Sequence, residues 1–316
     1  MAPRAESRSV QPAYPHAMFN EQTVFLNGEF IARNDARVSA FDAGLQHGVG
    51  LFETMLAVRT ASDADIIGLD AHIDRLIDSA RTLRLSEDLK SVGLAEAARQ
   101  TFEKSGYDRA RIRLTITGGD LNLLESKGES NIRPTILCVA QPATAYPNEM
   151  FDNGVLATIS DARANPFEPT AGHKSLDYWW RLRELQLAAA KGAGEAIVLQ
   201  VSNHVCGGCV SNILAVHGEV VMTPIARGEE KQGGVPSPVL PGVTRASVLG
   251  WAEEMGLEVS RQMMTVDDLL DADELMLTNS SWGVLPVTRL EGATIKDGKP
   301  GGVTRNLIGR WRELAG

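Results

Sequence analysis

The sequence has few residues of the kinds that mark several classes of protein. Only three of its 316 residues are cysteines, Cys138, Cys206 and Cys209, which is too few for a disulfide framework and predicts a cytoplasmic protein. No hydrophobic run approaches the ~20 residues that a membrane-spanning helix needs, and residues 1–20 lack the apolar block of a secretory signal. Basic residues number 31 against 40 acidic ones, and the resulting net charge of −9 argues against a nucleic-acid or anionic-membrane partner.

The chain is long enough for two folded domains, at roughly 100–200 residues per domain. Its hydrophobic content of 43% and charged content of 22% are typical of soluble globular proteins. Residues 1–20 support no periodic pattern and predict a loose N-terminal tail. We expect a small domain over 21–140, a linker over 141–152 that contains two prolines, and a larger domain over 153–316.

Hydrophobic periodicity predicts a mixture of helices and strands. Asn27 and Gly28 between two apolar runs predict a β-hairpin, and the alternation over 111–117 predicts a half-buried strand. Ile73, Leu76 and Ile77 fall on one face of a helix for which Asp70 is the expected N-cap. Further helices are expected over 94–104, 175–191, 244–255 and 303–314. Because helices and strands do not alternate strictly, the pattern favours an α+β fold or a mixed barrel over a doubly wound sheet.

Two stretches in the first half carry more than a scaffold requires. Residues 41–54, FDAGLQHGVGLFET, place three glycines within seven positions ahead of a strand, which predicts a tight turn or a close backbone approach. In HIDRL, residues 72–76, Arg75 lies beside the apolar stripe of a helix. Such an arginine is either a salt-bridged surface group or a ligand for phosphate.

Two stretches in the second half offer similar alternatives. Lys174, in GHKSLDY, is either a solvent-exposed lysine or, if sheltered with a lowered pKa, an amine that forms an imine. LPGVTR, residues 240–245, opens a helix, so the N–H groups of Val243 and Thr244 form an anion site or simply start the helix.

Together these stretches resemble the fold-type IV pyridoxal-phosphate enzymes, the class-IV aminotransferases. That family includes branched-chain amino-acid transaminases, D-amino-acid transaminases and aminodeoxychorismate lyases. The resemblance runs from Val24 to Leu307 and depends on seven phrases in order: FLNGEF, FDAGLQHGVGLFET, HIDRL, RIRLTITGG, KSLDY, LPGVTR and DELMLTNSSWGVLPV. It implies a small N-terminal α/β sandwich, a larger C-terminal mixed, barrel-like domain with helices, a cofactor between them, and a homodimer.

The resemblance also implies roles for individual residues. Lys174 matches the lysine that holds pyridoxal 5′-phosphate (PLP) as a Schiff base, and Tyr178 lies where many members place a tyrosine near the phenolic oxygen of PLP. Arg113 corresponds to an arginine at the substrate end of branched-chain enzymes. The residues matched to the phosphate are Arg75, the backbone amides of Val243 and Thr244, and the hydroxyl of Ser280.

The sequence departs from the family pattern at Gly207. Members usually carry a glutamate there, five residues before Asn212, which keeps the pyridine nitrogen of the cofactor protonated. Without that glutamate the ring is a weaker electron sink.

The neighbouring Cys206 and Cys209 form a CxxC pair. This pair either has no role or is a redox site or part of a metal site, and the sequence contains no second CxxC.

Three hypotheses follow for the function. The first is a PLP-dependent aminotransferase acting on a branched-chain or similar amino acid, with an amino donor and a keto-acid acceptor as its partners. The second is a lyase of the aminodeoxychorismate type, which would use the same cofactor residues. The third is a family member with altered or lost chemistry, for which Gly207 is the only support.

Overall fold

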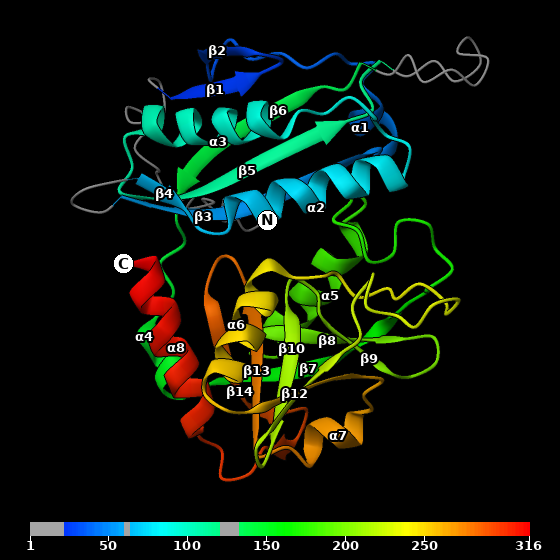
Figure 1. Cartoon of the computed structure of the whole chain (residues 1–316), viewed down its shortest axis with the longest axis vertical. Coiled ribbons are helices and arrows are strands. Elements are labelled where there is room, and N and C mark those ends of the chain that lie inside the picture. The colour runs from blue at the N-terminus through cyan, green and yellow to red at the C-terminus, as the bar shows by residue number, and fades with distance from the viewer. Residues whose placement is uncertain (1–21, 60–63, 121–132) are drawn as a thin grey trace, which may run out of the picture.

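The computed structural model describes residues 22–59, 64–120 and 133–316, so the predicted tail over 1–20 lies outside the described residues. Figure 1 shows two halves stacked along the long axis of the molecule, each built around its own sheet. Among the described residues no helix is long and apolar enough to cross a membrane.

The N-terminal half contains a sheet with strand order β2-β1-β6-β5-β3-β4, and its neighbouring strands pair antiparallel. The hairpin predicted at Asn27-Gly28 is confirmed, with both residues at positive φ, as a tight hairpin turn requires. The elements are β1 (Thr23–Leu26), β2 (Glu29–Ala32), α1 (Ala43–His47), β3 (Gly50–Arg59), β4 (Ala64–Ile66), α2 (Leu69–Thr82), α3 (Ser91–Ser105), β5 (Arg109–Thr117) and β6 (Ile136–Pro142).

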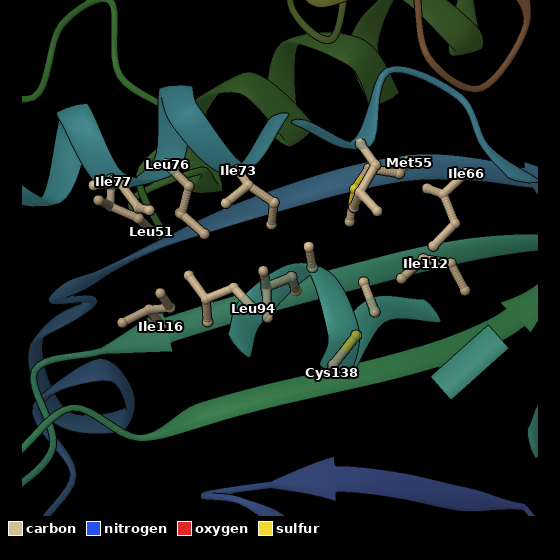
Figure 2. Close-up of a cluster of buried hydrophobic side chains, with 14 of the residues drawn as sticks. Leu51, Met55, Ile66, Ile73, Leu76, Ile77, Leu94, Ile112, Ile116 and Cys138 are labelled. Atoms are coloured by element: carbon tan, nitrogen blue, oxygen red, sulfur yellow. The ribbon is translucent and has the colours of Figure 1, made fainter. Parts of the chain in front are cut away.

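Helices α2 and α3 pack on one face of this sheet. Figure 2 shows Ile73, Leu76 and Ile77 of α2 lying over β3 and β5, with Leu94 of α3 in the same cluster. These side chains are buried, and each contributes roughly 1.5–3 kcal/mol when it leaves water. The apolar stripe read from the sequence is therefore the core-facing side of α2.

The C-terminal half contains a larger mixed sheet. Its order is β12-β11-β10-β13-β14-β7-β8-β9, with β15 paired to β14, and it combines parallel and antiparallel pairs. Its elements are α4 (Asn148–Asp152), β7 (Val155–Ala164), α5 (Trp179–Ala190), β8 (Glu195–Gln200), β9 (Val205–Gly208), β10 (Asn212–His217), β11 (Val220–Pro224), α6 (Val243–Glu254), β12 (Glu258–Gln262), α7 (Val266–Leu270), β13 (Glu274–Asn279), β14 (Gly283–Leu290), β15 (Ala293–Thr294) and α8 (Gly302–Ala315).

Both faces of this larger sheet are covered. Residues that alternate along β10 separate into two buried clusters: Ile213 packs with Leu269 of α7, whereas Leu214 packs with α6 and α8. The expected α+β architecture with a mixed, curled C-terminal sheet is confirmed. The chain passes from one sheet to the other over residues 143–154, so the predicted linker at 141–152 includes the end of β6 and all of α4. That the two halves are separate domains stays a prediction.

Three helix starts differ from the sequence-based predictions by two residues or more. Helix α3 begins at Ser91 rather than at residue 94. Helix α2 begins at Leu69 after Gly68, which has a left-handed conformation, so Asp70 is not the N-cap. Asp70 lies instead in the first turn, where its carboxylate interacts favourably with the helix dipole. Helix α5 begins at Trp179 rather than at residue 175. The reason is that the segment before it pairs with β3: the Phe52 N–H donates to the Lys174 carbonyl, and the Leu176 N–H donates to the Gly50 carbonyl, both at 2.9 Å.

Gly50 makes this pairing possible. A Cβ at this position would lie 2.5 Å from the Ile116 carbonyl oxygen and 2.6 Å from Leu176 Cδ1. Gly48, at a φ of 71°, ends α1 in the left-handed conformation that glycine tolerates best. The tight turn and close approach predicted from the glycines are confirmed, and they place Lys174 against β3.

Candidate active site

A cavity of about 550 Å³ lies between the two halves and is lined by residues from both. That volume is within the range of small-molecule sites. Six residues that the sequence singled out line it together: Lys174, Arg75, Tyr178, Val243, Ser280 and Arg113. The seventh, Thr244, is buried beside them, with its Oγ1 3.3 Å from Ser280 Oγ.

One corner of the cavity is built to hold an anion. The N-cap of α6 is Gly242, which has no side-chain cap, and no described residue accepts a hydrogen bond from the N–H groups of Val243 and Thr244. Asn212 Nδ2 donates to the Leu240 carbonyl at 2.9 Å and fixes the turn before the helix. A Cβ on Gly242 would collide with Asn212 Oδ1, so this turn requires glycine. Free N–H groups at a helix N-terminus favour a bound phosphate or carboxylate.

Arg75 reaches the same corner from α2. Its Nη1 donates to the Pro241 carbonyl at 2.7 Å, beside the start of α6. Its Nε and Nη2 donate to the two carboxylate oxygens of Glu53 on β3, at 2.9 and 2.6 Å. This bidentate pair holds the guanidinium plane in one orientation.

His72 extends the network across the two halves. Its Nδ1 lies 2.7 Å from Glu53 Oε2, and its Nε2 lies 3.1 Å from Ser280 Oγ. Burial lowers the pKa of His72, although the nearby Glu53 carboxylate opposes this shift. The lowered pKa favours the neutral ring. In the neutral ring Nδ1 donates to the carboxylate, and Nε2 then accepts from the Ser280 hydroxyl.

Glu53 is the buried anion at the centre of this network. Burial alone would raise its pKa, but the Arg75 charge and the hydrogen bonds from Arg75 and His72 hold it at about 2. We did not predict a role for Glu53 or His72 from the sequence. The sequence contains a signal for each of them, because Glu53 is the one charged residue in the run LFETMLAV and His72 belongs to the HIDRL phrase.

Lys174 lies in an apolar and cationic environment. Its Nζ lies 4.5 Å from the centre of the Phe52 ring and 5.5 Å from that of Tyr178. Burial lowers its pKa to about 8; the Glu53 charge opposes this, and the charges of Arg75, Arg113 and Arg181 reinforce it. Of the two interpretations of Lys174, the geometry supports the sheltered amine.

Tyr178 and Arg113 border the same aromatic ring. The Tyr178 ring meets Phe52 edge to face, and its hydroxyl donates to the Cys209 carbonyl at 3.1 Å. Burial raises the pKa of Tyr178, so this hydroxyl stays protonated. Arg113 stacks on Phe52, with Cζ 3.8 Å from the ring centre.

Gly207 lies in β9 behind the cavity wall, whereas its neighbours Cys206 and Gly208 line it, together with Cys209. The cysteines are free and buried, and burial raises the pKa of Cys206 and Cys209 to about 12. A thiol with so high a pKa is a poor nucleophile and metal ligand. No group of three or more His, Cys, Asp or Glu side chains within residues 22–59, 64–120 and 133–316 could hold a metal ion.

These donors fit PLP. The cofactor needs an anion site for its phosphate and a sheltered amine for its aldehyde, and both open into one cavity here. His173, which precedes the lysine and lines the cavity, has a buried Nε2 with no hydrogen-bond partner among the described residues. A polar atom of that kind is expected where a polar ligand completes the site.

The lowered pKa of Lys174 has a direct consequence for its reactivity. We expect reductive methylation of its amine to be half-maximal near pH 8, because only the neutral amine reacts with formaldehyde. An N-acetyl-lysine amide in the same solution, with an ordinary pKa of about 10.4, serves as the reference. Peptide mass spectrometry across a pH series measures both, and a half-maximum near 10 for Lys174 would contradict the sheltered environment.

Known proteins that are similar to this chain include aminotransferases, in agreement with the geometry of the cavity. The profile of the family described as amino-transferase class IV matches residues 50–290. A Methanocaldococcus jannaschii protein provisionally assigned as a branched-chain-amino-acid aminotransferase is 32% identical over 92% of this chain and 96% of its own length.

Two solved structures share the fold over nearly the whole chain. The T.th. branched-chain amino acid aminotransferase with pyridoxamine 5′-phosphate has a TM-score of 0.84 and 26% identity, covering 93% of this chain and 94% of that one. The 4-amino-4-deoxychorismate lyase of Pseudomonas aeruginosa has a TM-score of 0.77 and 26% identity, covering 93% and 100%. With the anion corner and the sheltered lysine, these matches confirm the resemblance: the chain belongs to the class IV aminotransferase family of PLP-dependent enzymes.

Proposed function

We propose that this chain transfers the amino group of a branched-chain or similar L-amino acid to a keto acid, with PLP held on Lys174. The observation that carries the proposal is the sheltered Lys174 amine opening into the same cavity as the anion corner of Arg75 and α6. When bound, PLP withdraws electrons from the substrate Cα. Lys174, with a pKa of about 8, has enough neutral amine near neutral pH to bond to an aldehyde and to accept a proton.

The remaining residues bind and orient. Arg75, Ser280 and the N–H groups of Val243 and Thr244 are the proposed phosphate ligands, and Tyr178 is the proposed neighbour of the phenolic oxygen. Arg113, held on Phe52, is the proposed partner of the substrate carboxylate.

The side chains that line the cavity and the names of similar proteins both support a branched aliphatic substrate. Apolar side chains of the cavity include Leu182, Leu185, Val239 and Trp282, which suit an aliphatic side chain. The M. jannaschii and T.th. proteins carry the branched-chain name. The lyase stays the alternative because the P. aeruginosa enzyme matches over its whole length. A chain without catalysis is disfavoured, since Lys174 and Arg75 are both in place.

A donor screen on the PLP-loaded protein tests this proposal. We expect leucine, isoleucine or valine with 2-oxoglutarate to yield glutamate. Lys174→Ala should abolish turnover, whereas Lys191→Ala, at the exposed end of α5, should retain it. Pyruvate release from aminodeoxychorismate would select the lyase, and turnover of D-alanine alone would contradict the L-amino-acid assignment.

The phosphate role of Arg75 is tested by comparing PLP with pyridoxal, which lacks the phosphate. Arg75→Met should weaken PLP binding about tenfold or more, because hydrogen bonds to a charged group contribute about 1.5–3 kcal/mol each. Pyridoxal binding should change little, and Arg81→Met, on the exposed side of the same helix, should leave both affinities unchanged. Circular dichroism reports whether unpaired Glu53 disturbs the fold. An equal loss for both ligands would show that Arg75 does not bind the phosphate.

We also propose that the enzyme is a cytoplasmic homodimer. The family resemblance supports the dimer, and so do large apolar side chains that lie largely exposed on the single chain, among them Phe41, Leu45, Phe167 and Trp179. The three free thiols suit a reducing compartment.

The dimer is tested by sedimentation velocity at micromolar concentration. We expect a mass about twice the 34.1 kDa of one chain, because the exposed apolar side chains would be covered in the dimer. A single species at the mass of one chain would contradict the dimer.

A further inference from the structure

The cavity has no acidic wall. Among the described residues that line it there is no aspartate or glutamate, whereas Arg75, Arg111, Arg113, Lys174 and Arg181 all reach it. Glu53 acts from behind Arg75 and does not line the cavity. A cofactor in this cavity therefore meets no carboxylate from the described part of the chain.

The nearest buried acid on the β9 side is already engaged. Glu195 of β8 accepts hydrogen bonds from the N–H groups of Cys209 and Val210 and from the Ser211 hydroxyl, at 2.8 to 3.2 Å. These hydrogen bonds stabilise the turn after β9. Glu195 itself does not line the cavity.

The backbone at Gly207 is also shaped for glycine. Its φ is 145°, a conformation that residues with side chains rarely adopt. A Cβ there would lie 2.9 Å from the Ser211 carbonyl oxygen and 3.4 Å from Asn212 Cα. A glutamate at this position would require the β9–β10 turn to move, so the wall differs from the usual family pattern by more than one side chain.

Arg181 occupies the cavity wall beside this turn. It lies in the first turn of α5, stacks on Trp180 with Cζ 4.4 Å from the ring centre, and lines the cavity. Its Nη1 donates to the carbonyls of Cys209 and Gly208, at 3.3 and 3.5 Å, the two residues that follow Gly207. Nε and Nη2 have no acceptor in the described part of the chain, and no carboxylate there forms an ion pair with Arg181. A guanidinium has five N–H donors, so several remain for a ligand.

We propose that Arg181 donates a hydrogen bond to the pyridine nitrogen of bound PLP, and that this nitrogen stays unprotonated. The inference rests on the proposed binding of PLP in this cavity. The lysine and the phosphate corner bind groups on neighbouring carbons of the ring, so the nitrogen faces a part of the wall that neither supplies. The resemblance places position 207 at that nitrogen, and Arg181 is bonded to the residues next to it.

The consequence is electrostatic. A positive charge beside the nitrogen disfavours its protonation, whereas the usual carboxylate favours it. An unprotonated ring stabilises negative charge at the substrate Cα less well. We therefore expect proton loss from Cα to be slower here than in a site with the carboxylate.

Two measurements test the proposal, one of binding affinity and one of the protonation state of the ring nitrogen. The first uses pyridoxamine 5′-phosphate and its 1-deaza analogue, which lacks the ring nitrogen, and neither ligand bonds covalently to Lys174. Wild-type protein should bind the nitrogen-containing ligand about 10-fold or more tightly, and Arg181→Met should bind both equally. Arg111→Met, which removes another arginine from the same cavity, should keep the wild-type ratio.

The second measurement is the ¹⁵N chemical shift of ring-labelled pyridoxamine 5′-phosphate bound to the wild-type protein at pH 7. We expect the shift of an unprotonated nitrogen that accepts a hydrogen bond. A protonated nitrogen, or equal binding of the two ligands by wild type, would overturn the inference and leave the proposed function standing. Failure of wild type to bind either ligand would instead overturn the proposed function, and this inference with it.

Discussion

The ion pair between Glu53 and Arg75 is the interaction on which the site depends. Both residues belong to the N-terminal half, but the pair reaches the other half through the Pro241 carbonyl and, by way of His72, through Ser280. A buried carboxylate is costly unless it is paired, and Arg75 and His72 together satisfy it. The same contacts that compensate the buried charge therefore orient the arginine at the N-terminus of α6.

Strand β3 organises the rest of the cavity. Its backbone at Gly50 and Phe52 pairs with the segment that carries Lys174, so a lysine from the C-terminal half is held by a strand of the N-terminal half. Successive side chains of a strand point to opposite faces. Phe52 thus lies against Lys174 and Arg113 in the cavity, while Glu53 faces α2 and holds Arg75.

The charge of the cavity is opposite to that of the chain. The protein carries a net charge of −9, but the described side chains that line the cavity include five cationic residues and no carboxylate. A phosphate and the carboxylate of an amino acid are both anions, so such a cavity suits a cofactor and a substrate of this kind. The charges of three of these residues, Arg75, Arg113 and Arg181, also contribute to the low pKa of Lys174.

The sequence by itself determined the features that are encoded locally. The Asn27-Gly28 hairpin, the apolar stripe of α2, and the glycine-containing turn that opens α6 each depend on residues a few positions apart, so their patterns were readable directly. The family phrases then predicted roles for Lys174 and Arg75. Tertiary structure alone decided that α5 starts at Trp179, because residues 174–176 pair with a distant strand. It also decided that Glu53 holds Arg75, that His72 meets Ser280 across 208 positions of the chain, and that Arg181 lies beside the Gly207 turn. Hydrogen bonds between such distant residues form only once the sheets and helices have packed, so no local pattern specifies them.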